Sequence, residues 1–314
     1  MMKYSVVIPA HNAEKFLPSA LESVRSQHRL PEAVIVVDDG SSDATARIAA
    51  SYQCMVISHP IAKGPSAARN AGVAATSTEL VAFLDADDEW RSDHAERLLV
   101  AFDSPDTVFC GSDAEIFGAD SGLITAPIAA GEPIEVIDAL LLENVIIQST
   151  VIVRRNGFTA VGGYDESLSV SEDYDLWMRL SEYGKFYYVS EATVRRRMHA
   201  SQLSQYNAVQ FLRNGWLIRR RVLARRLSGA SPERHAHVLE TLKAAARRDV
   251  QYAISLGWLA FLRTVRDELE RTDQEFALSG TLAALGGASS FKHRWSVSLQ
   301  CAARVPLRLF GGVR

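Results

Sequence analysis

Residues 80–88 of the chain read LVAFLDADD, an unbroken apolar run that ends in a cluster of acids. A run of this kind, without polar alternation, is typical of a strand buried on both faces of a sheet. Residues 4–9 (YSVVIP) and 34–37 (VIVV) have the same form, and residues 55–57 (MVI) predict a further strand. Amphipathic stretches separate these runs, so residues 4–88 predict the order β-α-β-α-β-α-β. We therefore expect a doubly wound α/β domain with a mostly parallel sheet.

Polar residues follow three of these strands where each strand ends. Residues 9–12 (PAHN) follow the first strand, residues 38–41 (DDGS) the second and residues 85–88 (DADD) the fourth. In open α/β sheets the ligand lies beyond the carboxyl ends of the strands. The sequence therefore predicts that these clusters line one crevice.

The composition fits one large domain with an appendage. The chain has 314 residues, of which 47% are hydrophobic, enough for a sizeable core. Three scattered cysteines, Cys54, Cys110 and Cys301, predict neither a disulfide framework nor a zinc site. The N-terminal residues lead directly into the first strand, and no run approaches the roughly 18 apolar residues that span a bilayer. We therefore expect a cytoplasmic protein that is not integral to a membrane.

The net charge of −3 conceals two parts of opposite sign. Residues 1–204 hold 16 Lys/Arg and 29 Asp/Glu, a net charge of −13, whereas residues 205–314 hold 18 and 8, a net charge of +10. Apolar spacing after residue 204 is almost wholly helical. We therefore expect a main domain at 1–204 and a basic helical region at 205–314.

A basic amphipathic stretch at residues 292–308 has two interpretations. Lysine and arginine interleaved with apolar residues are typical of helices that lie on anionic membranes, here at the inner face. The alternative is a helical cap on the acidic part of this chain or on a second subunit. Neither interpretation involves nucleic acid.

The acids of residues 85–88 are close enough to repel one another, and a bound cation would relieve that repulsion. Oxygen ligation suits Mg²⁺ or Mn²⁺, which take one or two carboxylates and complete their shell with phosphate oxygens and water. The alternative is a solvated acidic turn that caps a helix starting near Ser92. His199 is a further candidate ligand of metal or phosphate, although a lone histidine is usually neither.

Other charged residues also have two interpretations each. Asp38 and Asp39 suit contacts with a nucleobase or ribose, or else turn and N-cap chemistry at residues 41–43. Arg69 suits contact with a base or diphosphate, or else a surface position with its stem packed on a helix. The pair at residues 172–173 (ED) suits a general base and its neighbour, or else first-turn acids that favour the helix dipole.

In order and spacing, these segments resemble the inverting glycosyltransferases of family 2, which have the GT-A fold. The matching segments are residues 5–12 (SVVIPAHN), 36–43 (VVDDGSSD), 64–72 (GPSAARNAG), 83–88 (FLDADD) and 172–177 (EDYDLW). The resemblance covers roughly residues 4–204. It implies a nucleotide-sugar half at about 1–105, an acceptor half at about 106–204 and a C-terminal extension at 205–314.

The resemblance also implies a role for each candidate residue. The donor nucleotide would contact Pro9, His11, Asp38 or Asp39, Arg69 and Asp85. The cation on the donor diphosphate, Mn²⁺ or Mg²⁺, would be held by Asp87, with Asp85 and His199 as further ligands. Asp173 would be the catalytic base, with Glu172 beside it, and residues 163–166 (GYDE) would lie near the acceptor.

The implied reaction is a single displacement that inverts the anomeric centre. A sugar moves from a nucleotide-diphospho-sugar, most commonly a UDP-sugar, to a hydroxyl of a saccharide or lipid-linked acceptor, in polysaccharide or glycoconjugate biosynthesis. The alternative from another class is a non-catalytic nucleotide-sugar-binding protein of the same fold. A sugar-phosphate nucleotidyltransferase fits less well, because residues 9–13 lack a Gly-rich basic loop, and the absence of Gly-x-Gly-x-x-Gly argues against a dinucleotide-binding oxidoreductase.

Overall fold

The computed structural model describes residues 2–199, 208–227, 237, 241 and 244–245. The chain divides into two compact units, Met1–Ile218 and Arg219–Arg314. The helix α9 (Ala208–Leu227) is part of the predicted C-terminal region, but the basic stretch at 292–308 lies outside the described residues. Within the described residues, no helix is both long and apolar enough to cross a membrane.

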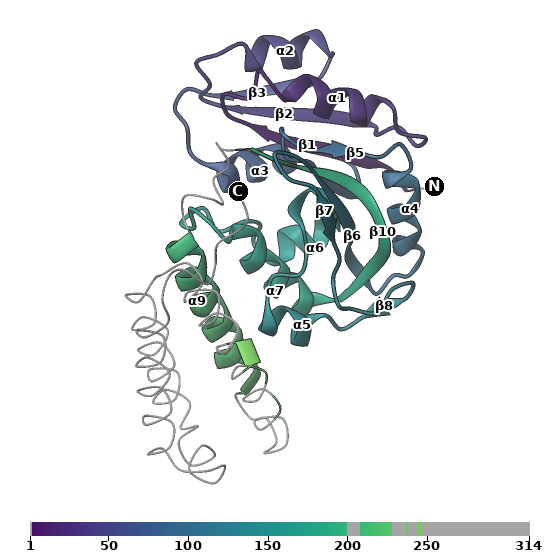
Figure 1. Ribbon diagram of the computed structural model, residues 1–314, viewed down its shortest axis with the longest axis vertical. Coiled ribbons are helices and arrows are strands. Elements are labelled where there is room, and N and C mark those ends of the chain that lie inside the picture. Colours follow the sequence, from purple (N-terminus) through teal and green to yellow (C-terminus); the bar gives the residue numbers. More distant parts are fainter. Residues whose placement is uncertain (1, 200–207, 228–236, 238–240, 242–243, 246–314) are drawn as a thin grey trace, which may run out of the picture. The chain divides into compact units, whose positions relative to one another are not determined.

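Four parallel strands form one side of the sheet, in the order β3-β2-β1-β4, of which Figure 1 labels the first three. Their bounds are β1 (Tyr4–Ala10), β2 (Ala33–Asp39), β3 (Met55–His59) and β4 (Leu80–Phe83). The connecting helices are α1 (Leu17–Arg25), α2 (Thr45–Ser51) and α3 (Pro65–Ala74). The predicted alternation of strands and helices over this part of the chain is confirmed.

Helices cover both faces of these strands. Alternate residues of β1 and β2 pack with α1 and α2 on one face, and the intervening residues of β2 pack with α3 on the other. The helix α3 approaches closely at Gly72, where a Cβ would lie 2.4 Å from a methyl of Val7. Burial on both faces is the reason that the strands are apolar throughout.

The remaining strands make the sheet mixed. β9 (Ile152–Arg154) runs antiparallel between β4 and β6 (Thr107–Gly118), and β10 (Lys185–Met198) runs parallel to β6. Short antiparallel strands complete the sheet, namely β5 (Glu89–Trp90), β7 (Gly122–Ile124) and β8 (Pro133–Ile134). Segments from both predicted halves therefore share one sheet.

Short helices cover this second part of the sheet. They are α4 (His94–Leu99), η1 (Val100–Asp103), α5 (Ile137–Leu142), η2 (Gln148–Thr150), α6 (Arg155–Ala160) and the longer α7 (Glu172–Tyr183). In α7, Trp177 stacks on Phe109 of β6, with ring centroids 5.9 Å apart. This contact fixes the helix that begins with Glu172 and Asp173 against the sheet.

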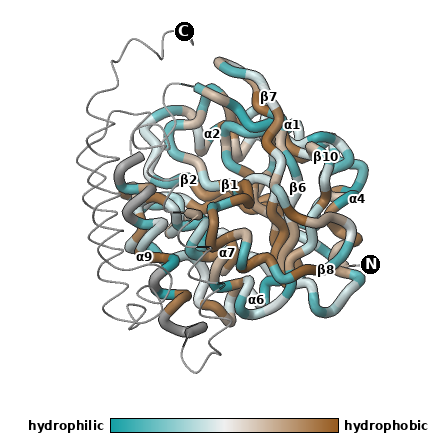
Figure 2. The backbone as a smooth tube through the Cα atoms, turned by 60° about the horizontal axis from the view of Figure 1, so that its bottom comes forward, coloured by the Kyte–Doolittle hydropathy of each residue, from teal (hydrophilic) through white to brown (hydrophobic). Residues whose placement is uncertain are grey.

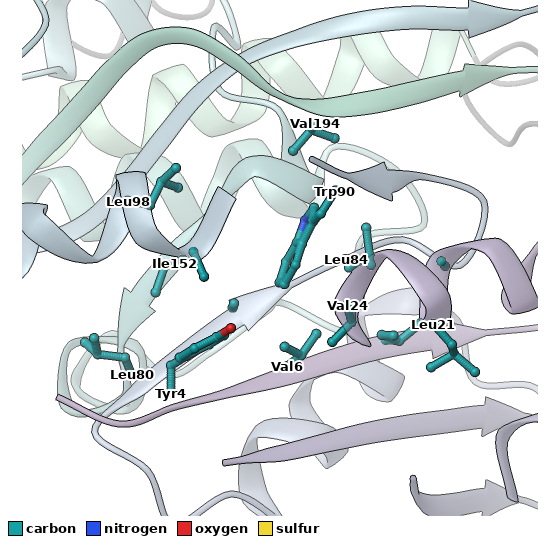
Figure 3. Packing of buried hydrophobic residues seen from close by; sticks show 14 of the residues in the cluster. Tyr4, Val6, Leu21, Val24, Leu80, Leu84, Trp90, Leu98, Ile152 and Val194 are labelled. Atoms are coloured by element: carbon teal, nitrogen blue, oxygen red, sulfur yellow. The ribbon is translucent and has the colours of Figure 1, made fainter. Parts of the chain in front are cut away.

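Trp90 lies in the larger hydrophobic core, and Figure 3 shows its indole among Val24, Leu84 and Val194. Figure 2 shows the hydrophobic residues concentrated along β1 and β6, with hydrophilic segments around them. The Trp90 indole N–H donates to the carbonyl of Ser149 at 2.8 Å. The core is therefore bonded directly to the segment that precedes β9.

Two helices begin one or two residues later than predicted. The helix α2 begins at Thr45 with Ala44 at its N-cap, and Asp43 accepts the Thr45 N–H at 2.9 Å just before the helix. The helix α4 begins at His94 with Asp93 at its N-cap, and β5 lies between the acidic cluster and this helix. The acids at residues 85–88 therefore do not cap a helix.

Candidate active site

Three strand ends meet at one edge of the sheet, as the sequence predicts. β1 lies between β2 and β4, with Ala10 beside Asp38 and Val7 beside Phe83. The loops that follow these three strands are therefore neighbours.

Asp39 is buried, and its carboxylate holds the loop before α3. It accepts hydrogen bonds from His59 Nδ1 (2.6 Å), the Lys63 N–H (2.9 Å) and the Gly64 N–H (2.7 Å). Burial by itself would raise the pKa of Asp39, but these hydrogen bonds hold it below its ordinary value. Gly64 is the N-cap of α3, with a φ of 95°, so Asp39 fixes the start of the helix that carries Arg69.

Asp38 is buried like Asp39, but fewer donors contact its carboxylate. Within residues 2–199, its Oδ1 accepts the Ser41 N–H at 3.2 Å, and its Oδ2 has no hydrogen-bond partner. Of the two neighbouring acids, Asp38 is therefore the better candidate for a hydrogen bond to a nucleoside.

His11 is exposed and is held through both ring nitrogens. Its Nδ1 lies 2.7 Å from the Asp39 carbonyl, so Nδ1 carries the proton and Nε2 accepts from the Asn12 amide at 3.0 Å. Asn12, with a φ of 48°, accepts the Ser42 N–H at 2.9 Å. The loop after β1, which starts at the half-buried Pro9, is thereby bonded to the loop after β2.

Arg69 is buried between two acids, with 5% of its side chain exposed. Its Nη2 donates to Asp85 Oδ1 at 2.7 Å, and its Nη1 donates to Glu172 Oε1 at 2.8 Å. The guanidinium also lies 5.3 Å from the centre of the Tyr164 ring. Burial opposes the charge, but the attraction of Asp85 and Glu172 raises the pKa of Arg69 above its ordinary value. The surface position considered for Arg69 is therefore wrong.

The acids of residues 85–88 have different surroundings. Asp88 is buried and accepts the Ser149 hydroxyl at 2.6 Å and the Arg197 N–H at 2.8 Å. Burial, followed by the charges of Asp87 and Asp85, raises the pKa of Asp88 well above its ordinary value. Asp88 therefore anchors the cluster to β10, whereas Asp85 and Asp87 keep 32% and 28% of their side chains exposed.

Asp87 and His199 form the best candidate cation site. His199 Nε2 lies 2.8 Å from Asp87 Oδ2, and its ring packs on Phe16 with centroids 4.7 Å apart. Burial and the charge of Asp85 raise the pKa of Asp87, a cost that a nearby cation would relieve. Among the described residues, no three His, Cys, Asp or Glu side chains form a metal-binding group. The donors that are present, the carboxylates of Asp85 and Asp87 and the imidazole of His199, supply part of a coordination shell, which suits a cation that takes the rest from a diphosphate and water, as Mg²⁺ does.

Asp173 is half-buried in the first turn of α7, next to Glu172. Its Oδ1 accepts the Tyr174 N–H at 2.6 Å, and its Oδ2 accepts the Asn144 side-chain amide at 3.1 Å. Burial and the negative charge of Glu172 raise the pKa of Asp173 to about 7. A carboxyl with this pKa is suited to accepting a proton near neutral pH.

A short segment without any recognisable motif joins these parts, and sequence reasoning missed it. Asn144 bonds Asp173, Gln148 accepts the Tyr164 hydroxyl at 3.0 Å, and the Ser149 hydroxyl accepts the Asp85 N–H at 3.2 Å. Residues 144–149 lie in a loop and a 3-10 turn, where no hydrophobic period marks them. The antiparallel strand β9 that follows is what carries this segment between β4 and β6.

The loop near residues 163–166 is held from α3. Asn70 donates to the Tyr164 carbonyl at 3.0 Å and to Glu166 Oε1 at 2.9 Å, and its Oδ1 accepts the Tyr164 N–H at 2.9 Å. Gly163 adopts a φ of 68°, and a Cβ there would lie 2.8 Å from Asn70 Oδ1. Neighbouring residues of α3, Arg69 and Asn70, therefore fix both Glu172 and the loop before it.

Two family models match consecutive parts of the chain. Residues 5–129 match the model "Glycosyl transferase family 2", and residues 118–216 match the model "Glycosyltransferase like family 2". A curated relative, an uncharacterized glycosyltransferase of Rickettsia prowazekii, is 28% identical over 227 residues, which cover 68% of this chain and 71% of the relative.

Solved structures with the same fold include two glycosyltransferases. One is S. aureus TarS 1-349 in complex with UDP, with a TM-score of 0.63 and 20% identity over 87% of this chain and 83% of that chain. The other is the mannosyltransferase PcManGT from Pyrobaculum calidifontis in complex with GDP-Man and Mn²⁺, with a TM-score of 0.59 and 14% identity over 96% of this chain and 86% of that chain. These similarities confirm the predicted GT-A fold.

Proposed function

The chain belongs to glycosyltransferase family 2, and on this premise we propose that it transfers a sugar from a nucleotide-diphospho-sugar to an acceptor hydroxyl, with inversion at the anomeric carbon. We propose a UDP-sugar as donor and a saccharide or lipid-linked acceptor, in polysaccharide or glycoconjugate biosynthesis. Two solved structures of this fold carry UDP or GDP-Man, which supports a nucleotide-sugar donor.

The observation that carries the proposal is the buried bridge through Arg69. Asp85 follows β4 on the donor side, and Glu172 precedes Asp173 at the start of α7. Arg69 binds both acids, with distances of 2.7 and 2.8 Å. The start of α7, which carries the proposed proton acceptor, and the acidic cluster after β4 are thereby held by one arginine, an arrangement that suits a single displacement.

Asp173 is the proposed base. It takes the proton from the acceptor hydroxyl as the oxygen attacks the anomeric carbon, and the bond to the donor diphosphate breaks in the same displacement. A base with a pKa of about 7 is partly ionised at neutral pH and becomes a good acid once it holds the proton. Glu172 is paired with Arg69 and therefore supports Asp173 without itself accepting the proton.

On the donor side, the chain supplies acids and an imidazole for a divalent cation. Asp87 and His199 would hold Mn²⁺ or Mg²⁺. Asp85 would be a weaker ligand, because its Oδ1 is already bonded to Arg69. When bound, the cation neutralises the charge that develops on the departing diphosphate, an effect of several kcal/mol. Asp38 and His11, with Pro9 beside them, would contact the nucleoside.

The experiment is a panel of nucleotide-sugars with Mn²⁺, Mg²⁺ or excess chelator, in which release of the nucleoside diphosphate is measured. We expect cation-dependent release from one donor, by transfer to water when no acceptor is present. Tight donor binding without release under any condition would instead support the non-catalytic nucleotide-sugar-binding alternative.

A further inference from the structure

We propose that Asn144 is a positioning residue that fixes the Asp173 carboxylate for proton transfer. The proposal rests on the proposed role of Asp173 as the base. Asn144 lies in the loop after α5, 29 residues before Asp173 in the chain, in none of the segments that carry the family resemblance.

The side-chain amide of Asn144 has a defined orientation. Its Oδ1 accepts the Ile146 N–H at 3.4 Å, so the nitrogen end of the amide faces Asp173. Nδ2 donates to Asp173 Oδ2 at 3.1 Å. A flipped amide would place two oxygen acceptors against each other, which would be repulsive.

The two oxygens of Asp173 are held by different elements. Oδ1 accepts the N–H of Tyr174 from its own helix, whereas Oδ2 is held from the loop after α5. The elements themselves are joined, because the Tyr174 hydroxyl donates to the Leu140 carbonyl in α5. Without Asn144 the Asp173 carboxylate would keep only the hydrogen bond from the Tyr174 N–H to Oδ1. It could then rotate about that bond, so Oδ2 would no longer have a fixed direction.

Asn144 differs in kind from the charged neighbours of Asp173. Within the described residues these are Glu172 on the same helix and Arg69 from α3, and the Tyr164 phenol from the loop before α7, whose pKa burial raises, is an uncharged neighbour. Glu172 favours the protonated form, whereas Arg69, Asn144 and the Tyr174 N–H favour the carboxylate. Asn144 acts at one oxygen without a charge of its own, so Asn144→Ala removes the donor alone, whereas Asn144→Asp replaces it with a negatively charged acceptor of nearly the same shape.

The same segment also bonds the acidic cluster on the proposed donor side of the site. The Ser149 hydroxyl donates to Asp88 at 2.6 Å and accepts the Asp85 N–H at 3.2 Å. Residues 144–149 therefore set the position of the base relative to the acidic cluster. This placement explains why a loop with no motif of its own would matter to the reaction.

The test compares Asn144→Asp and Asn144→Ala with wild type in the 314-residue chain. Asn156→Asp is the matched control, because Asn156 is exposed on α6 and bonds only the neighbouring Gly157 N–H within the described residues. Carboxyl-labelled aspartate NMR without substrate gives the pKa of residue 173, and the pH dependence of donor turnover gives the acid limb of the rate. Thermal unfolding confirms that each variant is folded.

We expect the Asp173 pKa and the acid limb to rise together, by about one unit or more for each Asn144 variant, and to stay near wild type in Asn156→Asp. With a rise of one unit, turnover would fall about fivefold at pH 7 and recover at alkaline pH. An unchanged Asp173 pKa in both Asn144 variants, or a loss of turnover that is equal at all pH values, would overturn the proposal. A shifted pKa with an unshifted rate profile would instead remove Asp173 from the role of base.

Discussion

Replacement of Arg69 by methionine tests the buried bridge at the centre of the site. Methionine keeps most of the unbranched apolar stem of the side chain but removes the guanidinium, which leaves Asp85 and Glu172 without their cation. Removal of one partner of a buried ion pair typically costs about 3–5 kcal/mol. Asp85 is 32% exposed and is partly solvated, whereas Glu172 is 12% exposed, so most of the cost falls on Glu172.

We therefore expect Arg69→Met to lose about 3 kcal/mol of stability, at the lower end of that range. For a domain of this size, thermal unfolding would shift down by roughly 6–12 °C. The charge of Arg69 also lowers the pKa of Asp173, so its loss should move the acid limb of the turnover profile to higher pH. Differential scanning calorimetry and a pH–rate profile measure the two effects.

Two variants make the reasoning refutable. Arg97→Met removes an exposed arginine that pairs with Asp93 at 2.6 Å on α4, and it should unfold near the wild-type temperature. Arg69→Met combined with Glu172→Gln removes the acid that was left without a partner, so it should regain part of the lost stability. If Arg69→Met unfolds at the same temperature as wild type, or if the double variant is no more stable than Arg69→Met, the Arg69 bridge does not neutralise these acids.

Three further predictions follow from the site. Asp38→Asn should weaken donor binding with little loss of stability, whereas Asp39→Asn should lower the unfolding temperature more, because Asp39 accepts hydrogen bonds from His59, Lys63 and Gly64. Calorimetry of each variant, together with titration of the donor, separates the two effects. A larger loss of stability in Asp38→Asn than in Asp39→Asn would contradict this prediction. Asp87→Asn should raise the Mn²⁺ concentration needed for half-maximal turnover, and an unchanged metal requirement would exclude Asp87 as a ligand. Because the pKa of Asp173 is raised to about 7 in the folded state, its protonation stabilises the fold at low pH, and that stability is lost progressively as pH rises from the ordinary carboxyl pKa of about 4 to about 7. Asp173→Asn should therefore stabilise the protein more at pH 8 than at pH 5, by about 2–3 kcal/mol, and equal unfolding shifts at both pH values would refute this.

Much of the donor side could be predicted from the sequence, because it depends on local pattern and strand order. The apolar runs of β1, β2 and β4 identify buried parallel strands, and such strands bring their carboxyl ends together. Strand order by itself therefore places Asp38, Asp85 and Asp87 at one edge of the sheet. The helix of Glu172 and Asp173 is likewise visible in its apolar spacing.

The different surroundings and roles of neighbouring acids could not be predicted. Asp38 and Asp39 are adjacent and chemically equal in sequence, and the difference between them depends on His59 and the loop before α3. Asp87 and Asp88 also differ through distant residues, because Arg197 of β10 and Ser149 of η2 both bond Asp88.

The Arg69 bridge and the position of the loop after α5 could not be predicted from the sequence either. Burial of Arg69 between two acids requires α7 to lie close to α3, a contact that no periodicity reports. Asn144 and Ser149 reach the site because β9 runs antiparallel between β4 and β6, in an otherwise parallel neighbourhood. The position of β9 between β4 and β6 depends on the strand pairing of the whole sheet. The residues of the loop that precedes β9 therefore do not by themselves indicate where this loop lies.

The most direct test of the central claim is the turnover of the identified donor by Asp173→Asn, measured together with the donor dissociation constant on the same preparation. A general base contributes about 10²–10⁴-fold to the rate, so we predict that turnover falls by about that factor while donor affinity stays within about threefold of wild type. Substantial remaining turnover at unchanged affinity would contradict the assignment of Asp173 as the base, and with it the proposed chemistry of this site.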